Sequence, residues 1–312
     1  KAAAQGVQEA QTNLGVLYDT GRGTAEDNRT AARWFREAAA KGNKVAQYNL
    51  AVMLDNGDGI PVNKPQAAAL YNAAAAQGIT LALLPHAKIL DQLGKPVAAY
   101  QKFAEADEAG FLEATYVVGV KLQRGSGVAQ DEVAAVAKFR QAADGGYTVA
   151  KHQLGIILLK GEMGLNADPA AGVALVEEAA NKGHVPAIID LALIHDTGNG
   201  VEQDRTKALA YLQAAAKLGN PIALNATGER LLMGVGVEAN PAAAVEYFVA
   251  AVQARNPKAI FNMAQMYEAG VGIEANLEES IKLYRAAVDL GVAEAQERLV
   301  AACTGQTFAA CF

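Results

Sequence analysis

The chain has 312 residues, a formal net charge of −6 and only 6% aromatic residues, although 52% of its residues are apolar. Apolar content spread this evenly as alanine, leucine and valine predicts one elongated domain rather than two globular ones. The acidic balance argues against nucleic acid as a partner, and the lack of any apolar run near ~18 residues argues against a transmembrane segment.

A sequence pattern recurs about every 36 residues along most of the chain. Self-similarity at this period is typical of a solenoid, in which each unit buries its apolar surface only against its neighbours. The pattern is most visible as seven pairs of glycines, at Gly21/Gly23, Gly57/Gly59, Gly125/Gly127, Gly161/Gly164, Gly198/Gly200, Gly234/Gly236 and Gly270/Gly272.

Each copy of the pattern predicts two helices joined by the glycine loop. In the second copy, residues 46–54 and 67–75 both carry apolar residues at helical spacing. The loop glycines suit the end of the first helix, and alanine pairs such as Ala38/Ala39 let the second helix approach its neighbours closely. Asp or Asn stands where the second helix needs an N-cap, at Asp27, Asn63, Asp131, Asp168, Asp204, Asn240 and Asn276.

The repeats divide the chain as follows. Residues 1–9 match the end of a repeat, so we expect the sequence to start within one. The third repeat, residues 82–113, is short and degenerate, because Gly94-Lys95-Pro96 replaces the double-glycine loop, and a change in stacking is expected there. Residues 295–312 are predicted to form a C-terminal capping helix and tail. Between these ends, residues 10–294 hold eight repeats, which start near residues 10, 46, 82, 114, 150, 187, 223 and 259.

The run from Ala10 to Gly42, with Leu14-Gly15 in its first half and Trp34-Phe35 in its second, resembles the Sel1-like repeat, a relative of the tetratricopeptide repeat. The resemblance extends over nearly the whole chain. It implies an all-α fold, a right-handed superhelical α-solenoid of antiparallel helix pairs. It also implies a non-enzymatic scaffold or adaptor for protein-protein interaction, in roles such as a bacterial envelope regulator, a signalling protein or a host-interacting virulence factor.

The first helix of each pair is expected to line a concave binding groove. If Ala10, Leu14 and Tyr18 face the partner helix, the positions of Asn13 and Leu17 point outward. Asparagine recurs at the first of these positions, where its amide could bracket a peptide backbone. Apolar residues recur at the second, where they could anchor a peptide. The alternative is that both positions pack between neighbouring first helices.

A basic patch is also expected in this groove. Lys121, Arg124 and Lys160 stand out in an acidic protein and predict docking of an acidic or carboxylate-bearing segment. Together the candidate partner-binding residues are Asn13, Leu17, Asn49, Met53, Lys121, Arg124, Ile157, Lys160, Ile194, Arg230, Asn262 and Met266.

The sequence offers no recognisable catalytic or metal-binding motif. No HExxH pattern or paired Cys/His spacing occurs, and Ser126 and Ser280 are the only serines, neither of which begins an S-x-x-K. Three of the four histidines, His86, His152 and His195, fall on positions that normally pack between helices. We therefore predict no enzyme, no metal and no cofactor.

Cys303 and Cys311 are the only two cysteines. In a cytosolic protein they would be free thiols, whereas in an exported protein they could form a disulfide that closes a small loop. Their spacing resembles that of the helix-stapling cysteines of the Helicobacter cysteine-rich proteins, which are Sel1-like proteins with a proposed penicillin-binding activity. A small-ligand-binding or hydrolytic protein is therefore the alternative function.

The preferred interpretation is an exported bacterial protein, periplasmic or secreted, that binds a protein or peptide partner. A cytoplasmic or eukaryotic ER-associated location stays open. Because solenoid ends expose apolar faces unless they are capped, a homo-oligomer formed through these ends stays open as well.

Overall fold

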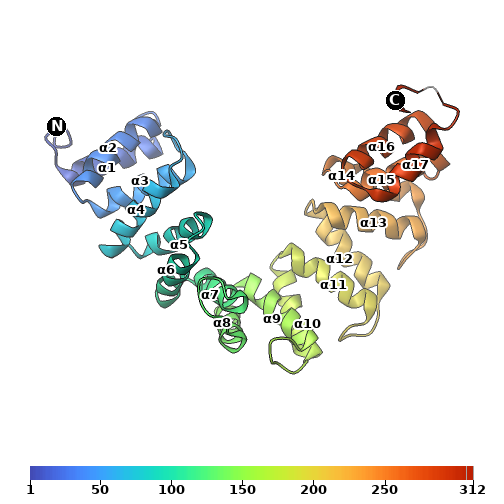
Figure 1. Ribbon diagram of the computed structural model, residues 1–312, viewed down its shortest axis with the longest axis horizontal. Coiled ribbons are helices and arrows are strands. Elements are labelled where there is room, and N and C mark those ends of the chain that lie inside the picture. The colour runs from blue at the N-terminus through green and yellow to red at the C-terminus, as the bar shows by residue number, and fades with distance from the viewer. Residues whose placement is uncertain (307, 312) are drawn as a thin grey trace. The chain divides into compact units, whose positions relative to one another are not determined.

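The computed structural model describes residues 1–306 and 308–311, which form seventeen α-helices, two short 3-10 segments and no strand. The chain consists of two compact units, Lys1–Ala150 and Lys151–Phe312. Within each unit, successive helices pack as antiparallel pairs, which Figure 1 shows as stacked hairpins. The predicted all-α solenoid of helix pairs is therefore confirmed.

The first unit contains four helix pairs, and the degenerate third repeat forms a pair like the others. A 3-10 segment, Thr80–Ala82, precedes its first helix. The pairs are α1 (Gln8–Thr20) with α2 (Asn28–Ala40), α3 (Lys44–Asn56) with α4 (Lys64–Ala76), α5 (Leu83–Gln92) with α6 (Pro96–Glu108), and α7 (Leu112–Arg124) with α8 (Glu132–Asp144).

The second unit continues the same alternation, with α9 beginning just before the unit boundary. The odd-numbered helices are called first helices below, and the even-numbered helices second helices. The elements are α9 (Thr148–Lys160), α10 (Pro169–Asn181), α11 (Val185–Thr197), α12 (Arg205–Lys217), α13 (Pro221–Met233), α14 (Pro241–Gln253), α15 (Pro257–Ala269), α16 (Leu277–Asp289), α17 (Ala293–Cys303) and the 3-10 segment Ala309–Cys311.

The predicted N-caps of the second helices are confirmed. In α2, the Asp27 carboxylate accepts a hydrogen bond from the Thr30 backbone N–H at 2.9 Å. This satisfies one of the donors that a helix start leaves without an intrahelical partner. The same contact occurs at Asn63, Asp131, Asp168, Asp204, Asn240 and Asn276.

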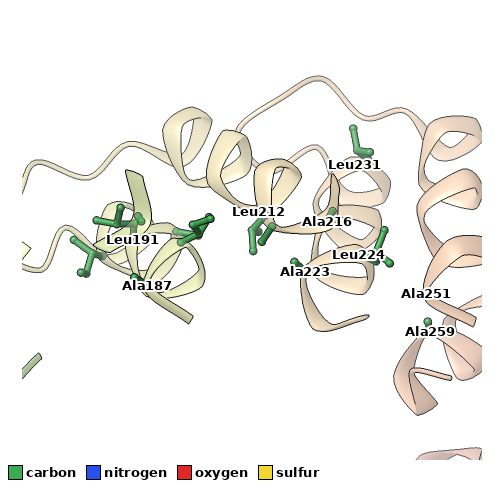
Figure 2. Close-up of a cluster of buried hydrophobic side chains, with 14 of the residues drawn as sticks. Ala187, Leu191, Leu212, Ala216, Ala223, Leu224, Leu231, Ala251 and Ala259 are labelled. Carbon is green, nitrogen blue, oxygen red and sulfur yellow. The ribbon is translucent and has the colours of Figure 1, made fainter. Parts of the chain in front are cut away.

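Within each unit, small and aliphatic side chains form apolar clusters between the helices. Figure 2 shows labelled core residues from five successive helices of the second unit, with Leu191 on α11, Leu212 on α12 and Leu224 on α13 among them. The alanines predicted to allow close approach of the second helices, such as Ala38 and Ala215, are fully buried. Because alanine adds little volume, neighbouring backbones come close enough for the larger residues to interdigitate.

The second glycine of the loop makes a contact between consecutive repeats. A Cβ added to Gly127 would lie 2.1 Å from the backbone oxygen of Pro96, the first residue of the preceding second helix. Gly236 meets the first residue of α12, Arg205, in the same way at 2.3 Å. Gly23 belongs to the first repeat, and an added Cβ there would meet nothing within 4 Å. At Gly127 and Gly236 the glycine is therefore needed for stacking as well as for its positive φ, whereas an added Cβ at Gly164 would meet nothing within 4 Å.

Beyond α17 the chain turns back onto the last repeat. A disulfide joins Cys303 to Cys311. Both cysteines and Phe308 pack against the apolar cluster that contains Tyr284 and Leu299. The predicted tail thus covers the apolar end of the α16/α17 layer.

The contact of the second loop glycine with the preceding repeat predicts a stability difference between two equivalent substitutions. Gly127 and Gly23 have φ angles of 79° and 75°, so alanine is strained alike at both positions. Gly127→Ala should destabilise the first unit by ~1–3 kcal/mol more than Gly23→Ala, because it also overpacks a backbone that cannot yield. Urea unfolding followed by circular dichroism measures this difference. Equal midpoints for the two variants would show that the contact is not needed.

Candidate functional site

The position of Leu17 in each repeat does not face outward as predicted. Leu17 itself is 41% exposed, but Met53 and Met266 are each 2% exposed, and Ile157 and Ile194 are buried as well. Leu17 lies on α1, the first of the described helices, whereas the other four side chains are buried within their units. The packing alternative therefore describes Met53, Ile157 and Met266, whereas Ile194, although buried, also lines the hollow between α9 and α11 that is described below.

The prediction that Lys121 belongs to a basic patch open to a partner is also wrong. Its side chain is buried on α7 and makes an ion pair with Asp91 of the preceding first helix, with a distance of 2.6 Å between Nζ and Oδ1. The ammonium also lies 5.5 Å from the centre of the Phe103 ring, a cation–π contact. Arg124 is exposed, and Lys160 is exposed but 3.6 Å from the Glu162 carboxylate. Lys121 is thus neutralised inside the stack and is not available to a partner.

Several predicted polar residues also connect consecutive repeats. Arg230 on α13 makes an ion pair with Asp196 on α11 at 2.9 Å. Asn262 on α15 donates hydrogen bonds to the Asn225 side-chain oxygen at 3.0 Å and to Glu229 at 3.1 Å. Of the other two candidate asparagines, Asn13 is exposed and Asn49 is half-buried.

An apolar hollow nevertheless exists between first helices of the second unit. Between α11 and α13 it measures about 410 Å³. Its most exposed side chains are all large and apolar. Leu193 is 59% exposed, Ile222 is 63% exposed and Met233 is 66% exposed. The remaining lining residues are Ile189, Ala192, Leu212, Ala226, Glu229, Arg230 and Val235.

A second hollow of about 370 Å³ lies on the other side of α11, against α9. Ile156 and Lys160 of α9 line it, and so does Leu193, which therefore belongs to both hollows. The two hollows form one surface across three first helices. This surface is called the apolar groove below and is defined by Ile156, Leu193, Ile222, Ala226 and Met233.

Most charged side chains around the apolar groove already have partners within the protein. Asp190 bonds to His152 Nε2 at 2.6 Å, and Glu229 accepts hydrogen bonds from Asn225 and Asn262. The Arg230 guanidinium is held by Asp196, although its Nη1 atom is buried without a hydrogen-bond partner. What the groove offers a ligand is therefore chiefly apolar surface.

The histidines are structural. His86 and His195 are buried as predicted, and His195 stacks on the Tyr211 ring at 5.6 Å. Burial lowers the pKa of His195, and the nearby Lys207 ammonium lowers it further, so the ring is held neutral. Burial lowers the pKa of His86 in the same way. A buried imidazole of this kind contributes to the packing of its helix pair.

Over residues 1–306 and 308–311, no three His, Cys, Asp or Glu side chains lie together in an arrangement that could hold a metal ion. Within the same residues, no helix has both the length and the apolar character needed to cross a bilayer.

A sequence signal for the apolar groove does exist, one residue before the position we selected. Ile156 and Leu193 occupy equivalent places in their repeats, and Val16, Val52 and Val120 occupy the same place in the first unit. A shift of one residue turns a helix by ~100°. The selected position faces the neighbouring repeat, and the residue before it faces the groove.

Comparison with known families matches seven copies of one repeat to this chain. The model of the Sel1 repeat matches residues 8–43, 44–79, 112–147, 148–184, 185–220, 221–256 and 257–292. Each matched copy comprises one first helix and the following second helix, and the gap from 80 to 111 is the degenerate pair α5 and α6. Among curated proteins, none matches the chain in sequence.

Two solved structures show the same fold. A Sel1 repeat protein from Oxalobacter formigenes is 27% identical, with a TM-score of 0.74 over 85% of this chain and 78% of that one. A protective antigen present in uropathogenic Escherichia coli strains, which displays an SLR fold, is 22% identical, with a TM-score of 0.59 over 98% of this chain and 74% of that one. Because the protective antigen is only 22% identical to this chain, its similarity shows the fold alone.

The ion pair between buried Lys121 and the partly exposed Asp91 predicts unequal effects when either partner is removed. Asp91→Ala leaves a buried ammonium without its counter-ion and should cost ~2 kcal/mol or more of unfolding free energy. Lys121→Met replaces the cation with an apolar chain of similar length and leaves Asp91 free to reach water, so it should cost less than ~1 kcal/mol. Chemical denaturation of both variants measures the difference. If Lys121→Met proved as damaging as Asp91→Ala, this interpretation of the pair would fail.

Proposed function

We propose that this chain, which belongs to the Sel1 repeat family, is a non-enzymatic scaffold that binds a segment of a partner protein in the apolar groove. The observation that carries the proposal is the gathering of Leu193, Ile222 and Met233, all more than half exposed, around one hollow. Large apolar side chains grouped in this way are uncommon on the surface of a protein that has no use for them.

The dimensions of the groove suit a short peptide. From Ile222 to Met233 the groove follows α13 for about 16 Å, at 1.5 Å per residue. An extended chain covers that distance in about five residues, and a helix in about three turns. Each Leu-sized side chain buried there is worth ~1.5–3 kcal/mol before the cost of ordering the peptide. Two or three such anchors give affinities typical of transient adaptor contacts.

Peptide selection tests this proposal. Random 12-residue peptides displayed on phage and selected on the wild-type protein should be enriched in Leu, Ile, Met or Phe at two or three positions. Leu193→Glu/Met233→Glu should weaken a selected synthetic peptide at least tenfold, since ~1.4 kcal/mol changes affinity tenfold and each anchor contributes more than that. Isothermal titration calorimetry measures the affinities.

Val133→Glu on α8 is the matched control, because Val133 is 78% exposed and lies in the first unit. It introduces the same chemical change away from the groove and should leave the affinity within twofold of wild type. Equal binding by the double groove variant and the wild type would refute the assignment of the site, provided circular dichroism shows both to be folded.

The proposal includes export to an oxidising compartment, and the disulfide between Cys303 and Cys311 supports this part. If the disulfide forms in the cell, neither cysteine should react with maleimide when cells of the source organism are lysed in the presence of the reagent. Both cysteines should react after the disulfide is reduced. Mass spectrometry of the C-terminal peptide reads this out. Labelling without reductant would place the protein in a reducing compartment instead.

A further inference from the structure

The first repeat carries an exposed group of arginines. Four of the chain's eleven arginines, Arg22, Arg29, Arg33 and Arg36, fall within residues 22–36. The last three lie on α2 at spacings of four and three residues, which puts them on one face of the helix over about 10 Å. All are exposed. Arg29, Arg33 and Arg36 are called the arginine stripe below.

Among the described residues, the arginine stripe forms no ion pair, although the hydrogen bonds from Thr30 and, to a smaller extent, the nearby Arg29 charge lower the pKa of the Asp27 carboxyl. Across residues 1–306 and 308–311, no ion pair involves Arg29, Arg33 or Arg36. The two nearest carboxylates in sequence have other roles, since Asp27 caps α2 and Glu37 accepts a hydrogen bond from Gln11. By contrast, many cations elsewhere are paired, as in Lys121–Asp91, Lys138–Asp107, Lys151–Glu178 and Arg230–Asp196.

The fold does not require these arginines. The equivalent positions on α4 are Pro65, Ala69 and Asn72, and on α12 they are Thr206, Ala210 and Gln213. Both helices form normal pairs without a positive charge there. On α16, Lys282 and Arg285 stand at the last two of these positions, but three arginines together occur only on α2. Stacking does not use this set of three, which is therefore free to serve recognition.

The indole beside the stripe orients one of its members. Cζ of Arg33 lies 5.2 Å from the ring centre of Trp34, the only tryptophan of the chain. Such a cation–π contact holds the guanidinium plane against the ring and leaves its N–H edges open to an acceptor. Fixing the side chain in advance lowers the entropy lost when an anion binds.

We propose that the arginine stripe binds an acidic segment of a partner polypeptide. Guanidinium groups form bidentate hydrogen bonds with carboxylates, and glutamates at i, i+4 and i+7 of a helix would match the spacing of the stripe. Nothing on α2 suits membrane insertion, because its described residues include no exposed large apolar side chain. The chain's net charge of −6 disfavours nucleic acid. This site is independent of the apolar groove, which lies in the second unit.

A synthetic peptide tests the proposal on the full-length protein. The probe is an 18-residue helical peptide with Glu at i, i+4 and i+7 on an alanine and glutamine background, and a version with Lys replacing Glu is the negative probe. Fluorescence of Trp34 reports binding at the stripe, and titration calorimetry gives the affinity at 50 and 200 mM NaCl. We expect saturable binding of the Glu peptide only, at least tenfold weaker at the higher salt concentration.

Two triple variants separate a local site from net charge. Arg29→Glu/Arg33→Glu/Arg36→Glu should weaken the Glu peptide at least tenfold, and the milder Arg→Gln triple variant should also weaken it if the first fails to fold. The matched control, Lys182→Glu/Arg205→Glu/Lys217→Glu, reverses three exposed cations of the second unit and should stay within twofold of wild type.

Three outcomes would overturn the proposal: equal losses in the two charge-reversed variants, no saturable binding by the wild type, or stronger binding to phosphatidylserine vesicles or a 20-base-pair duplex than to the peptide. Because the groove variant Leu193→Glu/Met233→Glu leaves the stripe intact, it should bind the Glu peptide normally. Failure at one site is thus distinguishable from failure at the other.

Discussion

No repeat of this protein buries its apolar surface alone, and most of the structure follows from that constraint. Within a helix pair, one side of the first helix is covered by the second helix, but its next face stays open until another repeat stacks on it. Met53, Ile157, Ile194 and Met266 show the outcome, because each lies at the same place in its repeat and each is buried. Leu17, at the same position on the first described helix, is 41% exposed.

The stacked surface also determines where buried polar groups are placed. Two ion pairs, Lys121–Asp91 and Arg230–Asp196, each join a first helix to the preceding first helix. In both pairs, the position of the acid within its repeat is two residues later than the position of the base within its own repeat. A charge pair at a buried junction adds little net stability over apolar packing, because desolvation offsets the Coulomb attraction. An ion pair does, however, require a more exact placement of the two helices than apolar packing does. A repeat that slid along its neighbour would leave both charges unpaired, so such pairs favour one register of stacking.

Much of the local structure could be predicted from the sequence, because its causes lie within one repeat. Asp27 and Asn63 cap helices through a hydrogen bond to a residue three positions away, and that chemistry needs no knowledge of the rest of the fold. The open face of the first helix could not be predicted in this way. Apolar spacing indicates that a face is covered, but it cannot tell whether the cover is the partner helix, the next repeat or a ligand. Leu193 and Ile194 are adjacent, and only the stacking geometry decides which of them is buried.

The same reasoning explains why some of the recognition residues we infer, Met233 and the arginine stripe, are departures from the repeat. Residues needed for stacking recur in copy after copy, because each interface has the same requirements, and an averaged pattern therefore highlights the core. Positions that the core does not use are free to differ between copies. Met233 on α13 has Thr197 on α11 and Ala269 on α15 as its equivalents. Arg29 on α2 likewise has Pro65 as its equivalent on α4. In a solenoid, the individual character of one copy is the better guide to binding, and the shared pattern is the better guide to fold.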